Sequence, residues 1–294
     1  MTTEVESIPY ESLGQPIRGP QALTDDWVRF WHLTLNIART EWKLRFYGSV
    51  LGYFWQLMRP LLLFGVLYVF FSVIGHVGRS GLPGEENYGV QMLGSIVLFT
   101  LFAESTGRSV RSVLERENLV RKIQFPRLVI PLSVVLLSLF NLGLNLIVVL
   151  IFALAAGVHP MLTWLEVPLI VAMLTLLSAG LAMLLSSLFV YFRDIEPIWE
   201  VVTQILFYAS PVIIPIQTIQ QNLSPTLVHL YMMSPVATAL QQFRHAVVTH
   251  QTPSAAEALG SHWALLVPIG IVVGVCVLGF VTFNRTAPYV AENL

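Results

Sequence analysis

Charged side chains are scarce in this sequence. Only 11% of its 294 residues are Asp, Glu, Lys or Arg, whereas 55% are hydrophobic, and an ordinary soluble domain carries roughly 25% charged residues. The 16 basic residues nearly balance the 17 acidic ones, which leaves a formal net charge of -1. The composition therefore predicts a membrane protein, and it lacks the basic excess that would favour a nucleic-acid partner.

Cysteine and the common enzyme motifs are also scarce or missing. The single cysteine, Cys276, excludes an intrachain disulfide and a cysteine-based metal cluster. The sequence contains no G-x-x-x-x-G-K-[ST], H-E-x-x-H, G-x-S-x-G or EF-hand motif, and its 7 histidines are dispersed. We therefore expect no catalytic residues, no metal site and no cofactor bound by this chain.

Six segments are apolar over a length that can cross a membrane. A helix needs about 20 apolar residues to span the hydrocarbon core, where its backbone groups must bond to one another. The candidates are residues 51–75, 88–106, 127–156, 162–191, 197–215 and 263–284. They predict an all-α integral membrane protein with six transmembrane helices.

The basic residues orient these spans. Of the 16 Lys and Arg residues, only Arg79 and Arg244 fall on one side of the expected membrane. Cytoplasmic loops carry the excess of Lys and Arg, so both termini are expected in the cytoplasm. The outer segments are then residues 76–87, 157–161 and 216–262.

The two ends of the chain are expected to be cytoplasmic tails. Residues 1–26 contain acidic residues, Pro and Gly, with no apolar stretch of the kind that marks a signal peptide. We expect a flexible tail there and a second one at residues 286–294, with the transmembrane domain at 48–285.

Acidic residues are missing from the middle of the spans. Only Glu104 falls inside one, near its cytoplasmic end, while Asp194, Glu196 and Glu200 cluster at the inner interface. Transport driven by protons or sodium normally needs ionisable groups near the midplane. The pattern therefore argues against ion coupling and favours an external energy source.

Residues 27–47 predict an amphipathic helix in the inner headgroup layer. Aromatic residues recur at spacings of three or four, and basic residues occupy other positions. The helix is either an interfacial anchor or a gate that moves against the first span. The gate candidates are Trp31, Arg39, Trp42 and Lys43.

Residues 107–125 predict a short charged helix on the cytoplasmic side. Arg111 with Glu115, and Glu117 with Arg121, form opposite-charge pairs at i,i+4 spacing. The segment could be solvated, but its apolar residues favour docking onto a cytoplasmic partner. On the outer side, five prolines interrupt the apolar stretch at about residues 210–253. We expect this stretch to form short helices that dip into the outer leaflet or close the outer mouth of the protein.

Several stretches, in their order and spacing, resemble one known family. They are YGSVLGYFWQLMRPLLLFGVLYVFF, ENLVRKIQFPRLVIPLS, YFRDIEPIWEVVTQILFYASPVIIP and SPVATALQQFRHAVV. The chain resembles, over about residues 27–285, the transmembrane subunit of type-2 ABC exporters. The resemblance is to the branch that exports lipid-linked polysaccharides such as O-antigen, capsule and teichoic acid.

The resemblance implies a homodimer with two copies of a separate cytoplasmic ABC ATPase, which uses ATP and Mg. It implies that residues 27–47 form a gate helix, about 108–123 a coupling helix and about 216–248 outer gate helices. The residues expected to couple to the ATPase are Arg111, Glu115, Glu117, Asn118, Arg121 and Lys122.

The first span suggests a substrate conduit. A helical wheel places its aromatic residues Tyr53, Phe64, Tyr68 and Phe71 within about 60° of one another. This stripe could stack against sugars, or it could be packing or lipid-facing surface. Arg59 either snorkels to the inner headgroups or faces a cavity and pairs with the pyrophosphate of a polyprenyl-linked glycan. Many family members are expected to carry a neutral polar residue at this position.

Other polar and small residues in the spans suggest helix contacts. Asn141 and Asn145 share one helix face and are expected to form hydrogen bonds within the bundle. Two strips of small residues could allow close helix approach. They are Ser178, Ala182 and Ser186 in one span, and Gly270 with Gly274 in another.

These patterns favour a permease of an ATP-driven exporter of polyprenyl-pyrophosphate-linked polysaccharide in a bacterial cytoplasmic membrane. A small-molecule or drug exporter of the same superfamily is the alternative. Two further classes are also possible from the sequence: a membrane-embedded transferase and a structural membrane scaffold.

Overall fold

The computed structural model describes residues 27–45, 47–48, 52–78, 81, 85, 87–116 and 126–286. All regular elements in these ranges are helical. Five helices there are long and apolar enough to cross a membrane: Phe54–Ile74, Tyr88–Glu115, Val129–Ala155, Leu162–Tyr191 and His262–Thr286. The prediction of an all-α, multi-pass membrane protein is confirmed, but these ranges hold five such helices where six were expected.

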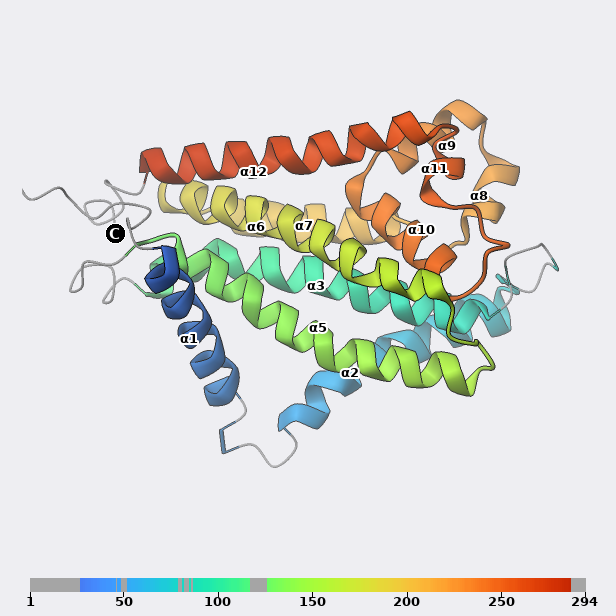
Figure 1. Cartoon of the computed structure of the whole chain (residues 1–294), viewed down its shortest axis with the longest axis horizontal. Coiled ribbons are helices and arrows are strands. Elements are labelled where there is room, and N and C mark those ends of the chain that lie inside the picture. Colours follow the sequence, from blue (N-terminus) through green and yellow to red (C-terminus); the bar gives the residue numbers. More distant parts are fainter. Residues whose placement is uncertain are drawn as a thin grey trace, which may run out of the picture.

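Helix α3 (Tyr88–Glu115) lies at the centre of the bundle, between α5 (Val129–Ala155) and α6 (Val167–Tyr191). In Figure 1 these three helices run side by side along the long axis. Most of the N-terminal half of α3 is buried, including polar Gln91 and Ser95. Since lipid is as apolar as a protein core, such a bundle is held mainly by close packing and internal hydrogen bonds.

Helix α12 (Leu266–Thr286) packs against α6 through two glycines. A Cβ atom built on Gly279 would lie only 2.1 Å from the carbonyl oxygen of Gly180. The same test at Gly270 and Gly274 finds no atom within 4 Å. The predicted Gly270 and Gly274 strip therefore does not mediate this contact, and Gly180 with Gly279 does. Of the other strip, Ser178, Ala182 and Ser186 are all buried in the bundle.

The first span combines two kinds of helix. The α-helix α2 (Gly52–Tyr68) contains Pro60 and continues into the π-helical segment η2 (Val69–Ile74). Much of its surface is exposed and apolar. It lies on the side of α3 that also contacts helix α7 (Ile195–Tyr208).

The predicted span at 197–215 is wrong as a single membrane-crossing helix. Helix α7 has 14 residues, so it is about 21 Å long at 1.5 Å per residue, against a hydrocarbon core of about 30 Å. The chain then leaves the helix through a turn that contains Pro211 and Pro215. Proline lacks the backbone N–H that a continuing helix would need.

Short helices gather at the end of the bundle beyond this turn. They are η3 (Leu162–Glu166), α8 (Ile216–Asn222), α9 (Pro225–Met232), α10 (Pro235–Val247), α11 (Ala255–Ala258) and η4 (His262–Leu265). Helices α9 and α10 each begin with a proline, which suits the first helical position because its missing N–H has no partner there anyway. The prediction of short helices within 216–248 is confirmed.

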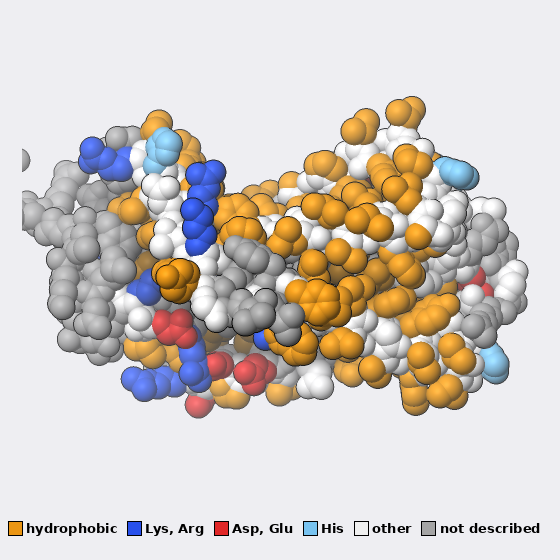
Figure 2. Space-filling model, turned by 90° about the horizontal axis from the view of Figure 1, so that it is seen from below, with side chains coloured by type: hydrophobic (Ala, Val, Ile, Leu, Met, Phe, Trp, Pro, Cys, Tyr) orange, Lys and Arg blue, Asp and Glu red, His pale blue; other side chains and the backbone are white. Residues whose placement is uncertain are grey.

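Helix α1 (Trp27–Arg45) lies at the opposite end and runs obliquely to the long helices (Figure 1). Its Phe30 is buried in an apolar cluster with Leu128 and Phe283. The beginning of α1 and the end of α12 therefore lie at the same end of the bundle, as the predicted topology requires. Figure 2 shows Lys, Arg, Asp and Glu side chains gathered mainly toward this end, with a mostly hydrophobic face beyond it.

The predicted coupling helix does not begin as a separate element. Residues 108–115 continue α3, whose Ser109 and Ser112 hydroxyls donate to backbone carbonyl oxygens one turn earlier. Val110 and Val113 are buried, so nothing interrupts the helix at residue 108. Residues 117–125 lie outside the described residues.

Candidate functional site

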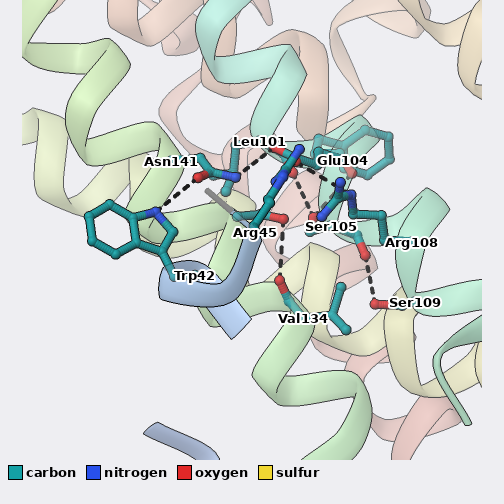
Figure 3. A network of polar contacts seen from close by, with 11 residues as sticks. Trp42, Arg45, Leu101, Glu104, Ser105, Arg108, Ser109, Val134 and Asn141 are labelled. Carbon is teal, nitrogen blue, oxygen red and sulfur yellow. Dashed lines mark hydrogen bonds and ion pairs between the residues drawn. The ribbon is translucent and has the colours of Figure 1, made fainter. Parts of the chain in front are cut away.

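A polar network joins the C-terminal end of α1 to the middle parts of α3 and α5 (Figure 3). Its centre is Glu104 of α3, whose side chain is only 13% exposed. Arg45 of α1 donates to the Glu104 carboxylate at 2.8 Å, and Arg108 lies one helical turn away at 3.4 Å. The carboxylate that stood out in the sequence is therefore bound by two arginines.

Asn141 of α5 completes this network. Its Nδ2 donates to Glu104 at 3.1 Å, and its Oδ1 accepts a hydrogen bond from the Trp42 indole at 3.2 Å. Because an indole N–H only donates, Trp42 fixes the amide with its oxygen toward α1 and its NH2 group toward Glu104. Asn145 donates to the Asn141 backbone carbonyl. The expectation that both asparagines form hydrogen bonds within the bundle is confirmed.

A second contact fastens α1 to the end of α3. Arg116, the residue after α3, forms an ion pair with Glu41 of α1. The same guanidinium donates to the hydroxyl of Ser133 at 3.0 Å and to the backbone carbonyl of Ile130 at 3.4 Å, both on α5. Arg116 thus connects three helices directly before residues 117–125.

A polar hollow of about 620 Å³ opens beside these ion pairs. Charged side chains of both signs line it from α1, α3 and α7, and α5 contributes Val134 and Leu137. The lining near the ion pairs consists of Glu41, Gly107, Arg108, Arg111, Glu115 and Arg116. The expected pair of Arg111 with Glu115 is not the direct contact; Arg111 instead binds Glu196 at 2.5 Å, because Glu196 at the start of α7 faces it across the hollow.

An apolar groove of about 490 Å³ lies on the other side of Gly107. It runs between α2, α3 and α7, and its lining includes Leu63, Phe99 and Phe207. Glu104 also lines this groove. The polar network and the apolar groove therefore meet at Glu104 on α3.

The predicted conduit residues are divided between two environments. Phe64 and Tyr68 pack inward, with ring centroids 5.7 Å from Phe152 and 6.3 Å from Tyr88 respectively. They line a separate hollow of about 460 Å³ that also contacts Tyr88 at the start of α3. Phe71 contacts the neighbouring Phe70 ring at 5.2 Å.

Arg59 is exposed on α2. It acts electrostatically on Arg108 together with Arg45, so these three arginines belong to one cationic region. The Tyr53 side chain lies outside the described residues.

The predicted gate residues lie on different faces of α1. Trp31, Arg39 and Lys43 are exposed, whereas Trp42 is half-buried against Asn141. Of the predicted coupling residues, Arg111 and Glu115 end α3, while Glu117, Asn118, Arg121 and Lys122 lie outside the described residues. Sequence reasoning missed Glu41, Arg45, Arg108 and Arg116 as members of the site; the only signal was the unusual position of Glu104 in an apolar span.

At the end of the bundle opposite α1, Arg244 of α10 is buried with 1% of its surface exposed. It donates to the carbonyl oxygens of Val212 at 2.9 Å and Ile214 at 3.5 Å, and to the Ser95 hydroxyl at 3.1 Å. Tyr88 donates to the intervening carbonyl of Ile213 at 2.6 Å. Burial lowers the pKa of Arg244 to about 10, which still leaves it charged at neutral pH. The turn after α7 is therefore held by a cation from a distant helix.

Comparison with known proteins agrees with this architecture. Residues 32–248 match the family described as ABC-2 type transporter. The O-antigen export system permease protein RfbA of Myxococcus xanthus is 29% identical over 225 residues, covering 76% of this chain and 83% of that protein. Two RfbA proteins of Klebsiella pneumoniae are 25% and 26% identical over 220 and 263 residues, covering 74% and 89% of this chain and 83% and 95% of theirs.

The family match spans most of the chain and includes the helices that form the polar network. Its members are non-catalytic membrane permeases of ABC transporters, and an ABC permease works with a partner ATPase. The resemblance inferred from the sequence motifs is thereby confirmed. This chain belongs to the ABC-2 type transporter family and is a multi-pass membrane permease rather than an enzyme.

Proposed function

We propose that this chain is the permease subunit of an ATP-driven exporter of polyprenyl-pyrophosphate-linked polysaccharide. It lies in the cytoplasmic membrane of a bacterium, with both termini in the cytoplasm. The end that carries α1 then faces the cytoplasm, and the short helices α8 to α11 face outward. The concentration of charged side chains toward the α1 end supports this orientation.

The proposed substrate class rests on one observation, namely that a cationic region adjoins an apolar groove. Arg45 and Arg108 contact Glu104, Arg59 lies close enough to repel the charge of Arg108, and Glu104 lines the groove beside them. A lipid diphosphate has the same division, with an anionic head and an apolar chain. Arginine is well suited to the head because its planar N–H groups match phosphate oxygens.

The relatives support the glycan part of the proposal. All three are named as O-antigen export permeases, so a lipid-linked polysaccharide is the substrate class that agrees with both the relatives and the cationic region. The aromatic rings of Phe64, Tyr68 and Phe71 would then lie along the route of the sugars. Their inward packing also gives them a structural role, and their part in transport is a proposal.

Energy for export comes from two copies of a cytoplasmic ABC ATPase, bound to a homodimer of this permease. ATP and Mg belong to the ATPase, and this chain binds no cofactor of its own. The proposed docking site is the segment of about residues 108–123, which begins in the last turns of α3 and includes Arg111 and Glu115. Helix α1 is the proposed gate, because the network on Glu104 holds it against α3 and α5.

The proposal is tested with the permease purified together with its ATPase and reconstituted in lipid. ATP turnover is measured with a polyprenyl-diphosphate glycan, with the free glycan and with a panel of amphipathic drugs. Stimulation by the lipid-linked glycan alone supports the proposal. Stimulation by drugs without a response to the glycan would instead indicate a small-molecule exporter.

A further inference from the structure

The contacts of Glu104 with two arginines also indicate how an anionic ligand could bind here. Its carboxylate accepts from Arg45 of α1 and lies 3.4 Å from Nε of Arg108, while Asn141 donates to its second oxygen. These are the donors that an anionic ligand would use. Glu104 therefore occupies the position of a bound anion, supplied by the protein itself.

Among the described residues, the other charged side chains near Glu104 are either paired with one another or exposed. Glu41 pairs with Arg116, and Glu196 pairs with Arg111. Glu115 and Glu200 are exposed. Arg59 is exposed too, and it forms none of the ion pairs between described side chains.

The surroundings of Glu104 fit an amphipathic anion better than a free one. The groove beside it is apolar, with Leu63, Ala103 and Phe207 in its lining. Gly107 lies between this groove and the polar hollow and has no side chain to separate them. A headgroup placed at Arg45 and Arg108 could therefore leave its chain in the groove.

We propose that the Glu104 carboxylate is an internal substitute for the diphosphate of a prenyl-linked substrate, which displaces it from Arg45 and Arg108 when the substrate is loaded. The inference rests on the proposed function and adds a competing residue to the same site. A diphosphate carries more negative charge than one carboxylate and offers more acceptor oxygens, so it can satisfy these arginines together with Arg59.

The exchange would also remove one of the links that hold the gate helix. Arg45 is on α1 and Glu104 is on α3, so their ion pair joins the two helices. Once Arg45 binds the substrate, this link no longer holds α1 in place. A ligand shifts a conformational equilibrium only through different affinity for the two states, and the exchange of partners at Arg45 supplies that difference.

The first test compares the wild-type complex, containing permease and ATPase in lipid nanodiscs, with Glu104→Gln. The probe is a long-chain prenyl diphosphate, and the uncharged prenol of the same length is the reference. The concentration for half-maximal stimulation of ATP turnover is measured. Glu104→Gln removes the competing charge while keeping the side-chain shape, so this concentration should fall by about fivefold or more.

Asp194→Asn is the matched control. It removes one acidic charge at the same end of the protein, from an exposed residue next to α7, and should leave the half-maximal concentration unchanged. If the wild type responds to prenyl diphosphate but Glu104→Gln needs the same or a higher concentration, the substitute role is refuted. If the wild type responds no better to prenyl diphosphate than to prenol, the proposed function fails as well.

A second measurement keeps Glu104 intact, which covers a variant that does not assemble. Spin labels are placed at Leu44→Cys on α1 and Gly143→Cys on α5, in a Cys276→Ser background. Leu44 is exposed, and a Cβ at Gly143 would meet no atom within 4 Å. Prenyl diphosphate, and not prenol, should shift the distance distribution. An unchanged distribution at saturating prenyl diphosphate would overturn the inference.

Discussion

Arg116 binds Glu41 across 75 positions of sequence and so ties the end of α3 to the amphipathic helix α1. It is also the last described residue before segment 117–125, which belongs to the proposed contact with the ATPase. The same guanidinium donates a hydrogen bond to Ser133 on α5. Arg116 can therefore pass a movement at the ATPase contact on to α1, alongside the ion pair of Arg45 with Glu104.

Replacing Arg116 should separate ATP hydrolysis from export. In Arg116→Gln the Glu41 carboxylate loses its ion pair, and a partly buried charge without its partner is costly. Export per ATP hydrolysed should fall by about tenfold. The double variant Glu41→Arg with Arg116→Glu should recover part of this ratio.

Arg193→Gln provides the control for the Arg116 variant. Arg193 is basic like Arg116, but it is exposed and lies between α6 and α7. Its loss should leave the ratio of export to hydrolysis unchanged. Equal losses of export and hydrolysis in Arg116→Gln would show that Arg116 serves assembly and does not transmit movement.

Replacing Gly279 with leucine should destabilise the contact between α6 and α12, whereas replacing Gly270 should not. Gly279→Leu places side-chain atoms against the Gly180 carbonyl, where even a Cβ would lie at 2.1 Å. Such overpacking typically costs about 1–3 kcal/mol, so the thermal unfolding midpoint in detergent should fall. Gly270→Leu, on the same helix but without a neighbour within 4 Å, should unfold near the wild-type temperature. Equal midpoints for the two variants would contradict the described packing.

Arg244 should matter more for stability than Tyr88, although both bind the same turn. Arg244→Met leaves the carbonyl oxygens of Val212 and Ile214 without this donor, and each unsatisfied buried group costs about 1–3 kcal/mol. Tyr88→Phe removes one bond, to Ile213, worth about 0.5–1.5 kcal/mol. Thermal unfolding should therefore rank Arg244→Met below Tyr88→Phe. The reverse order would exclude Arg244 as the main support of the turn.

The start of α11 should weaken at acidic pH. Ser254 and Glu257 form a capping box, and the Ser254 backbone N–H donates to the Glu257 carboxylate at 2.7 Å. This bond lowers the pKa of Glu257. The stabilisation is therefore present above the unfolded-state pKa and is lost as pH falls through the lower folded-state pKa. Hydrogen-exchange protection of α11, corrected for intrinsic rates, should decrease in that range in the wild type and be independent of pH in Glu257→Gln.

Much of the helical architecture could be predicted from hydropathy and proline placement. Long apolar runs gave four spans close to their observed bounds, and aromatic spacing gave α1, because both depend on neighbouring residues. The end of α7 could not be predicted in this way. It depends on Arg244, which bonds Val212 from 32 positions away, and an apolar sequence alone does not reveal such a partner.

The candidate site was only partly predictable for the same reason. Glu104 stood out as an acid in an apolar span, which indicates a partner but does not identify it. Arg45 lies 59 positions away and Asn141 lies 37 positions away. The packing of α1 against α5 brings Arg45 to Glu104, and the packing of α5 on α3 brings Asn141 there. The aromatic residues of α2 were correctly placed on one span, yet helical periodicity does not tell whether Phe64 faces a conduit or packs on Phe152.

The most direct test of the proposed function is transport of a labelled polyprenyl-diphosphate glycan by the reconstituted complex, comparing the wild type with Arg59→Gln. The wild type should move the glycan across the membrane in an ATP-dependent manner. Arg59→Gln should assemble normally and hydrolyse ATP but move the glycan several-fold more slowly, because an exposed cation of the headgroup site is lost. Unchanged export by Arg59→Gln would contradict the role of this arginine, and no ATP-dependent movement by the wild type would contradict the function itself.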